Sequence, residues 1–173
     1  MKLFGLFFLT SALAVTACTK STDSGGKTEA PSAVSTTAAT TESNITLSSV
    51  GETMAYDKTE LSVKAGEKIT LKFVNTSTTL AHNWVLVKPG QDDAVGVAGI
   101  QVGAEKNYVP VSPDVLASTR LVPPKGQKYA DKPSETSSGD ITITFTAPAA
   151  GDYPYICTNA GHHTVMKGVL HSK

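Results

Sequence analysis

Apolar and polar residues alternate in short stretches from Ile45 to the end of the chain. In Lys68–Val74 the apolar Ile69, Leu71 and Phe73 share one face, which is the period-two pattern of a half-buried β-strand. Similar stretches, separated by turn residues, cover residues 61–64, 83–87, 140–146, 152–157 and 167–171. Many short strands with turn signals between them predict an all-β domain, a Greek-key β-sandwich.

The alternation breaks between Lys88 and Ser138, where Gly, Pro, Asp and Lys are scattered. Residues 92–102 form a short run that predicts a helix, and residues 108–119 are expected to add a turn. A long connection without secondary structure is unusual within a compact domain. We therefore expect a helical flap, about residues 88–138, packed on one side of the sandwich.

The N-terminal segment has the pattern of an export signal. Lys2 is followed by an apolar run that is too short to span a membrane, and then by small residues. Residues 15–18 (Val-Thr-Ala-Cys) resemble the lipobox of bacterial lipoproteins, in which the cysteine becomes a lipid-carrying N-terminus. We expect a lipoprotein signal peptide at residues 1–17 and a lipid on Cys18 that anchors the protein to a membrane of the bacterial cell envelope, facing the periplasm or the exterior. The alternative is a soluble secreted protein in which Cys18 carries no lipid.

Residues 18–44 are almost wholly Ser, Thr, Ala, Gly and charged residues, with no periodic apolar positions. This composition cannot form a core, and it predicts a flexible tether. A coil of this length has a typical end-to-end distance of roughly 30 Å. The folded domain is therefore expected to cover residues 45–173 and to sample a shell of space above the membrane.

The charge balance and the cysteine count narrow the possible functions. The chain has 15 Lys and Arg against 15 Asp and Glu, and it lacks the basic cluster interleaved with aromatic residues that nucleic-acid binding needs. We therefore expect no nucleic-acid partner. If Cys18 carries lipid, Cys157 has no disulfide partner in the chain. Such a cysteine is a buried inert thiol, half of an intermolecular bridge, or a metal ligand.

The segment CTNAGHHTVM places a thiol, two imidazoles and a thioether within a few positions. His162 follows Cys157 by five residues and Met166 follows His162 by four, so a turn between them would let all three face one ion. Thiolate and thioether favour a soft metal while imidazole accepts a harder oxidised state, which together indicate copper. Zinc gains little from the thioether, and iron–sulfur clusters need more cysteines. A blue copper site also needs a second imidazole, for which His82 is the candidate.

The segments Ala-His-Asn-Trp-Val-Leu (residues 81–86) and Cys-Thr-Asn-Ala-Gly-His-His-Thr-Val-Met-Lys-Gly (residues 157–168) resemble the two ligand segments of azurins and auracyanins, which are small blue copper proteins of the cupredoxin fold. The resemblance extends over nearly all of the domain. It implies one mononuclear type 1 copper that cycles between Cu(I) and Cu(II). The implied trigonal ligands are His82, Cys157 and His162. The resemblance further implies Met166 as the long axial ligand and the backbone carbonyl of Ala81 as a weak contact opposite.

Three polar residues near these segments have other expected roles. His163 is expected to face solvent or to form a hydrogen bond, because His162 occupies the family's ligand position. His171, near the C-terminus, is expected to be exposed. The side chain of Asn83 is expected to hydrogen-bond across to the loop that carries Cys157 and to hold the two ligand segments in register. The alternative for Asn83 is capping of its own backbone.

The sequence departs from the family at two points. The family usually has Phe-Pro where this chain has Asn159-Ala160, so the docking surface is not expected to be purely apolar. A donor from Asn159 near the sulfur would stabilise the reduced site, which predicts a higher reduction potential than in an Asn159→Phe variant. Azurins also carry a disulfide that this chain cannot form, and this places it nearer the tethered auracyanins.

These features predict an electron carrier and not an enzyme. The imidazole edge of His162, flanked by Leu80 and Ala160, is the expected route for electrons to a docked partner. Suitable partners for a monomer of this kind are a cytochrome c, a membrane electron-transfer complex or a reductase. A copper enzyme would need a second centre built from histidines, and only His163 and His171 remain. The alternative is a copper carrier or storage protein of the cell envelope.

Overall fold

The computed structural model describes residues 42–173, with side chains from residue 43 onward. The expected signal peptide, Cys18 and residues 18–41 of the expected tether lie outside the described residues. No helix within the described part of the chain is long and apolar enough to cross a bilayer.

The first sheet has four strands in the order β2-β1-β4-β7. Its parallel pair is β1 with β4, while β2 and β7 run antiparallel to their neighbours. The bounds of the strands in chain order are β1 Glu42–Val50, β2 Thr53–Tyr56, β4 Lys68–Val74 and β7 Asp140–Thr146. The inward alternation of β4 is as expected, because Ile69, Leu71 and Phe73 are all fully buried.

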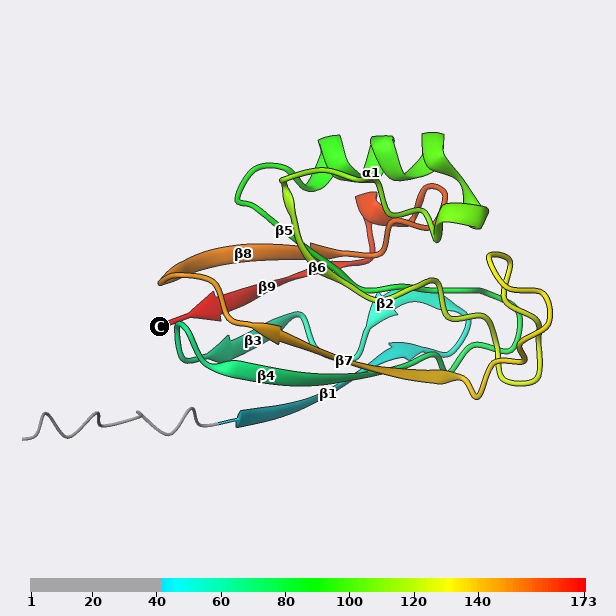
Figure 1. Cartoon of the computed structure of the whole chain (residues 1–173), viewed down its shortest axis with the longest axis horizontal. Coiled ribbons are helices and arrows are strands. Elements are labelled where there is room, and N and C mark those ends of the chain that lie inside the picture. Colours follow the sequence, from blue (N-terminus) through cyan, green and yellow to red (C-terminus); the bar gives the residue numbers. More distant parts are fainter. Residues whose placement is uncertain (1–41) are drawn as a thin grey trace, which may run out of the picture. The chain divides into compact units, whose positions relative to one another are not determined.

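The second sheet has five strands in the order β3-β9-β8-β5-β6. Only β3 and β9 are parallel, and the other neighbours are antiparallel. The bounds are β3 Glu60–Val63, β5 Val85–Val87, β6 Val115–Ser118, β8 Gly151–Ile156 and β9 Lys167–Ser172. The two sheets form two layers in Figure 1, and the main core lies between them. The expected all-β sandwich is confirmed.

The helix α1 (Asp92–Val102) forms an additional layer outside the five-stranded sheet, as Figure 1 shows. Its Val95 packs with Val85 and Val87 of β5 and with Ile156 of β8, while Leu86 faces the main core. β5 is therefore covered on both faces, which explains why all three of its residues are apolar and buried. The bounds of α1 are those expected from the sequence.

One boundary of the fold differs from expectation, and one segment does more than expected. Residues 42–44, which we expected in the tether, belong to β1 and pair with β4. The segment at residues 108–119 contains the expected turn, at residues 113–114, and then forms the edge strand β6, which pairs with β5. The insertion at residues 88–138 is thus partly a flap, with α1 and the 3-10 helix η1 (Ala104–Lys106), and partly a strand of the sandwich.

Candidate metal centre

Three ligand-type side chains meet in the buried interior of the domain. The Sγ atom of Cys157 lies 3.4 Å from Nδ1 of His162 and 3.8 Å from Nδ1 of His82. The three atoms lie within 4.8 Å of one another, and all three residues are buried. Within residues 42–173 no other group of three His, Cys, Asp or Glu side chains meets this condition. The structure therefore brings together the three residues that the sequence selected.

Regular backbone hydrogen bonds position each of these side chains. His82 forms an isolated antiparallel bridge with Val122, in which each N–H donates to the other's carbonyl (3.1 and 2.8 Å). Cys157 directly follows β8. His162 opens the 3-10 helix η2 (His162–Thr164) after Gly161, whose φ of 82° lies in the left-handed region that glycine adopts without strain.

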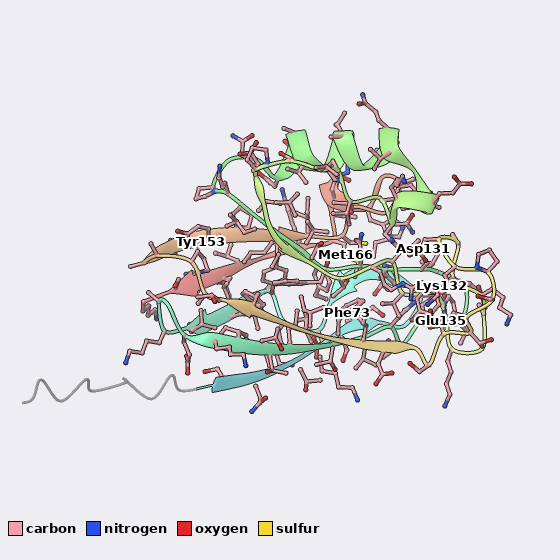
Figure 2. All side chains as sticks on the ribbon, in the orientation of Figure 1. Phe73, Asp131, Lys132, Glu135, Tyr153 and Met166 are labelled. Carbon is pink, nitrogen blue, oxygen red and sulfur yellow. The ribbon has the colours of Figure 1, made fainter. Side chains whose placement is uncertain are left out.

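Met166 is folded back beside the cysteine. The N–H of Cys157 donates to the carbonyl of Met166 (3.0 Å), and the N–H of Met166 donates to the carbonyl of His162 (2.8 Å). Met166 is fully buried, and Figure 2 labels it in the interior of the domain. The turn expected within residues 157–166 therefore forms and brings the backbone of Met166 next to that of Cys157.

Burial sets the protonation of the site. Burial lowers the pKa of His82 to about 4, and the nearby His162 acts in the same direction. Burial also lowers the pKa of His162 and raises the pKa of the Cys157 thiol to about 12, against a smaller opposing effect of backbone N–H groups. Near neutral pH both imidazoles are neutral, with lone pairs free for a metal. The thiol must lose its proton when a metal binds, so metal affinity rises with pH.

The donor set fits copper. Two neutral imidazoles and one thiol form the trigonal part of a blue copper site, and a thioether is its usual weak axial ligand. Nδ1 of His82 faces the thiol, and its Nε2 is buried without a hydrogen-bond partner. A neutral ring that carries its proton on Nε2 would leave the lone pair of Nδ1 for a metal. The residues present therefore suit a soft, redox-active ion better than a hard one.

Asn83 links the two ligand segments as expected. Its Oδ1 accepts the N–H of Thr158 (2.8 Å), and its Nδ2 donates to Oγ1 of Thr158 (2.8 Å) and to the carbonyl of Asn107 (2.9 Å). The hydroxyl of Tyr56 donates to the carbonyl of Asn83 (2.7 Å). Asn83 is fully buried. The residue next to His82 is thus bound directly to the residue next to Cys157.

Asn107 extends this link to the surface, a feature that the sequence did not reveal. Its Oδ1 accepts the N–H of Leu121 (3.0 Å), and its Nδ2 donates to Asp131 (3.0 Å), which also accepts from Arg120 (2.6 Å). Asn107 has a φ of 58°, a costly conformation outside glycine that its several hydrogen bonds maintain. Figure 2 labels Asp131 among a group of charged side chains at one end of the domain.

Asn159 does not do what the sequence suggested. Its Nδ2 donates to the carbonyl of Ala81 (2.7 Å), and its Oδ1 accepts the N–H of Ala160 (2.8 Å). The expectation that this side chain supplies a donor near the sulfur is wrong. The amide instead donates a hydrogen bond to the Ala81 carbonyl, which the family resemblance gave as the weak contact to copper.

Replacement of Asn159 by phenylalanine is still expected to lower the reduction midpoint, for a different reason. The Ala81 carbonyl accepts a hydrogen bond from the amide of Asn159, and without this bond the carbonyl would be a stronger electron donor to an oxidised copper held beside it. The fall is expected to be about 40 mV, because one hydrogen bond has a net value of about 1 kcal/mol. Redox titration measures it. Thr164→Ala, which removes a contact to Gly161 in the same loop, is the control. An unchanged or higher midpoint in Asn159→Phe contradicts the expectation.

The two remaining histidines differ from expectation in part. His163 is only 6% exposed because it packs against Gly96 of α1, so it is more buried than expected, and it lies outside the group of three ligand-type residues, as expected. His171 is half-buried on the outer face of the five-stranded sheet, where it contacts Asp152 through Nδ1 (2.7 Å) and Glu60 through Nε2. The hydrogen bonds to Asp152 and Glu60 raise the pKa of His171.

Glu52 holds the loop that leads to His82, which the sequence gave no reason to expect. Its carboxylate accepts hydrogen bonds from Oγ of Ser77 (2.7 Å), from the N–H and Oγ1 of Thr78 (2.6 and 2.9 Å) and from Oγ1 of Thr79. These bonds, led by that of Thr79, lower the pKa of Glu52 to about 2. The link between Glu52 and this loop could be recognised only in the structure, because Glu52 is distant from the loop in the chain.

This carboxylate predicts an acid-dependent loss of stability. The pKa of Glu52 is lower in the folded state than its ordinary value of 4.5, so its contribution is present above pH 4.5 and is lost as the pH falls toward 2. In Glu52→Gln the Tm of the apoprotein is therefore expected to decline less than that of the wild type between these two pH values. Thermal unfolding monitored by circular dichroism measures the difference. The exposed Glu105→Gln is the control, and parallel declines in wild type and Glu52→Gln contradict the prediction.

Comparisons with known proteins agree with this geometry. Residues 43–172 match the family of copper binding proteins described as the plastocyanin/azurin family. Auracyanin-A of Chloroflexus aurantiacus is 41% identical over 128 residues, which cover 73% of this chain and 72% of the relative. The azurin of Methylobacillus flagellatus is 30% identical over 130 residues, which cover 70% of this chain and 80% of the relative.

Solved structures show the same relationship. The structure of auracyanin A, described as a "blue" copper protein from Chloroflexus aurantiacus, has a TM-score of 0.65 and 38% identity, and covers 77% of this chain and 100% of its own. The dithionite-reduced auracyanin of Roseiflexus castenholzii has a TM-score of 0.65 and 37% identity, and covers 75% of this chain and 96% of its own. The chain therefore belongs to the plastocyanin/azurin family of copper-binding proteins, as a blue copper electron-transfer protein with one type 1 copper.

Proposed function

We propose that this protein is a membrane-tethered carrier of single electrons between redox partners outside the cytoplasmic membrane. Nδ1 of His82, Sγ of Cys157 and Nδ1 of His162 are the proposed trigonal copper ligands. Met166 would be a weak axial ligand, and the Ala81 carbonyl would add a further weak contact. The observation that carries the proposal is the convergence of a buried thiol and two buried neutral imidazoles within 4.8 Å.

Bound copper supplies a centre that gains and loses one electron. The protein's part is to keep that centre dry and its ligands fixed. His82, Cys157 and Met166 are fully buried, so water does not reach the donor atoms to reorganise around a changing charge. The hydrogen bonds of Asn83 to Thr158 fix the spacing of the two ligand segments. A fixed, water-excluding site suits fast electron transfer, because little has to move between the two oxidation states.

His162 is the proposed point of electron entry and exit. It is 6% exposed, whereas His82 and Cys157 are 0% exposed, so its ring is the part of the donor set that comes nearest to solvent. The half-buried Leu80 and the exposed Ala160 precede the two ligand histidines in the chain. A small, weak interface at this surface would allow the rapid turnover that a carrier needs.

The tether and the partners belong to the proposal as well. Lipid on Cys18 would keep the domain, as a monomer, at the surface of an envelope membrane, where its reach is set by the intervening residues. A cytochrome c, a membrane electron-transfer complex or a reductase fits such a carrier. Replacement of Cys18 by serine is expected to release the protein from isolated membranes into the soluble fraction. Retention of Cys18→Ser on washed membranes would argue against the anchor.

Titration of the purified protein with copper(II) tests the function. An electron carrier is expected to develop an intense thiolate-to-copper absorption band, to show a reversible one-electron midpoint, and to release copper slowly to a chelator. The alternative, a copper carrier or storage protein of the cell envelope, predicts a weakly coloured complex that gives up its metal readily. The burial of the donor set favours the first outcome.

A further inference from the structure

We propose that α1 holds the ligand loop, residues 157–166, in position, and we call this role of the helix a splint. His163 is the positioning residue, and it packs on Gly96 of the helix. The proposal rests on the copper ligands proposed above. Figure 1 shows α1 along the outer side of the five-stranded sheet, over the turn that connects β8 and β9. The helix contacts residues that directly precede or follow proposed ligands in the chain.

The tightest contact joins Gly96 and His163. A Cβ atom placed on Gly96 would lie 2.2 Å from Cγ, 2.4 Å from Cδ2 and 2.7 Å from Cβ of His163. The imidazole therefore lies directly on the helix backbone, and any larger residue at position 96 would displace it. His163 is 6% exposed, and its Nδ1 is buried without a hydrogen-bond partner, so packing on the helix holds this ring in place.

A second contact lies beside the cysteine. A Cβ atom on Gly99 would lie 2.4 Å from the carbonyl oxygen of Tyr108 and 3.1 Å from Cβ of Thr158. Thr158 is the residue that Asn83 binds through two hydrogen bonds, and it directly follows Cys157. The helix backbone at Gly99 thus packs closely against Thr158, which directly follows the proposed thiolate ligand.

Two further contacts complete the set. Val95 packs with Ile156, the residue before Cys157, within a small cluster of buried side chains. Asp92 pairs with Lys167, the residue after Met166, at 3.4 Å. This ion pair is partly exposed and adds little by itself. The apolar contacts therefore carry most of the proposed effect.

These contacts share one pattern. Cys157, His162 and Met166 face the interior, and each has a chain neighbour in contact with α1. A displacement of the helix would therefore reach all three proposed ligands through the backbone. Glycine is among the least favourable residues inside a helix, yet α1 has two, both buried where another part of the chain lies against the backbone. The contact with His163 explains Gly96, and the contacts with the Tyr108 carbonyl and with Thr158 explain Gly99, because only glycine permits so close an approach.

The Gly96→Ala variant of the full-length, copper-loaded protein tests the proposal. Helix propensity alone predicts a firmer helix and an unchanged centre. The splint predicts that the new methyl group pushes His163 aside, since close-packed interiors do not absorb added volume. We expect copper release to a chelator about tenfold faster than in the wild type, the effect of typical overpacking. We also expect a shifted thiolate-to-copper band and faster amide hydrogen exchange of residues 157–166 in the apoprotein.

A compensating variant separates positioning from general damage. His163→Ala removes the ring that Gly96→Ala strikes, so the double variant is expected to lie closer to the wild type in release rate and band position than Gly96→Ala alone. Val97→Ala, on the exposed face of the same helix, introduces the same residue next to Gly96 without weakening the helix or touching the loop, and is expected to keep the wild-type spectrum. A double variant no better than Gly96→Ala, or a shifted band in Val97→Ala, overturns the proposal.

The outcomes distinguish this proposal from the proposed function. If the ligand assignment is wrong, the wild type itself shows no thiolate-to-copper band. If only the splint is wrong, the wild type shows the band and Gly96→Ala matches it in band position, copper release and hydrogen exchange. Should Gly96→Ala fail to fold, His163→Ala carries the test, with faster copper release expected and a wild-type rate overturning the proposal.

Discussion

Replacement of Cys157 by serine is expected to abolish the intense visible band and the reversible midpoint of the copper-loaded protein. The serine hydroxyl is not ionised under these conditions and cannot supply the soft thiolate that a blue copper centre requires. Loss of a direct ligand is expected to weaken copper binding by more than about 100-fold, because even partners outside the ligand set are worth 10 to 100-fold. Absorption spectroscopy and a competition titration with a chelator measure both effects.

The fold is expected to survive this substitution. Serine is nearly the same size as cysteine, and a buried hydroxyl without a partner costs about 1–3 kcal/mol, which leaves most of the stability of an ordinary domain. Circular dichroism of the apoprotein should therefore resemble that of the wild type. His171→Gln, at a histidine whose side chain bonds to Asp152 and Glu60 outside the metal centre, should keep the band and the midpoint. A blue, redox-active Cys157→Ser protein would remove the basis of the proposed function.

Replacement of Asn83 by alanine is expected to lower both stability and copper affinity. It leaves the N–H and Oγ1 of Thr158 and the carbonyl of Asn107 without their partner in a buried region. We expect a loss of about 3 kcal/mol in the free energy of unfolding, which corresponds to a fall of roughly 10 °C in Tm. Copper affinity should fall by about 10-fold or more, because the two ligand segments lose their common brace.

Thermal unfolding of the apoprotein and the holoprotein measures the two effects separately. Asn44→Ala, at an exposed position of β1, is the matched control and should unfold at the wild-type temperature. If the apoprotein of Asn83→Ala also unfolds at that temperature, the hydrogen bonds of Asn83 contribute nothing measurable. If only the holoprotein is affected, the effect of Asn83 is limited to the metal centre.

The parts of the fold that could be predicted are those with a strong local pattern. Lys68–Val74 alternates cleanly because one face packs into the core and the other faces out. The helix Asp92–Val102 was recognisable as an apolar run between turn residues. β6 was not, because none of its four residues is fully buried, so it lacks a clear apolar face. Its strand character comes from pairing with β5, which lies far away in the chain.

The metal site likewise has a part that could be predicted from the sequence and a part that could not. Cys157 and His162 lie close in the sequence, and their chemistry alone indicated a metal; His82 followed from the need for a second imidazole. The partner of Asn159 was not predictable, because its amide reaches the Ala81 carbonyl across a separation of 78 residues. The packing of His163 on α1 was also not predicted, although two glycines within a predicted helix, Gly96 and Gly99, were a signal of close backbone approach.

The separation of 75 residues between His82 and Cys157 also determines when the metal can enter. Small zinc domains fold around their ion, because their ligands lie in one short segment. Here the two ligand segments meet only after the strands between them have paired, and such distant pairings form slowly. The complete donor set therefore exists only when most of the chain has its native arrangement, and we expect copper to reach its final coordination late in folding.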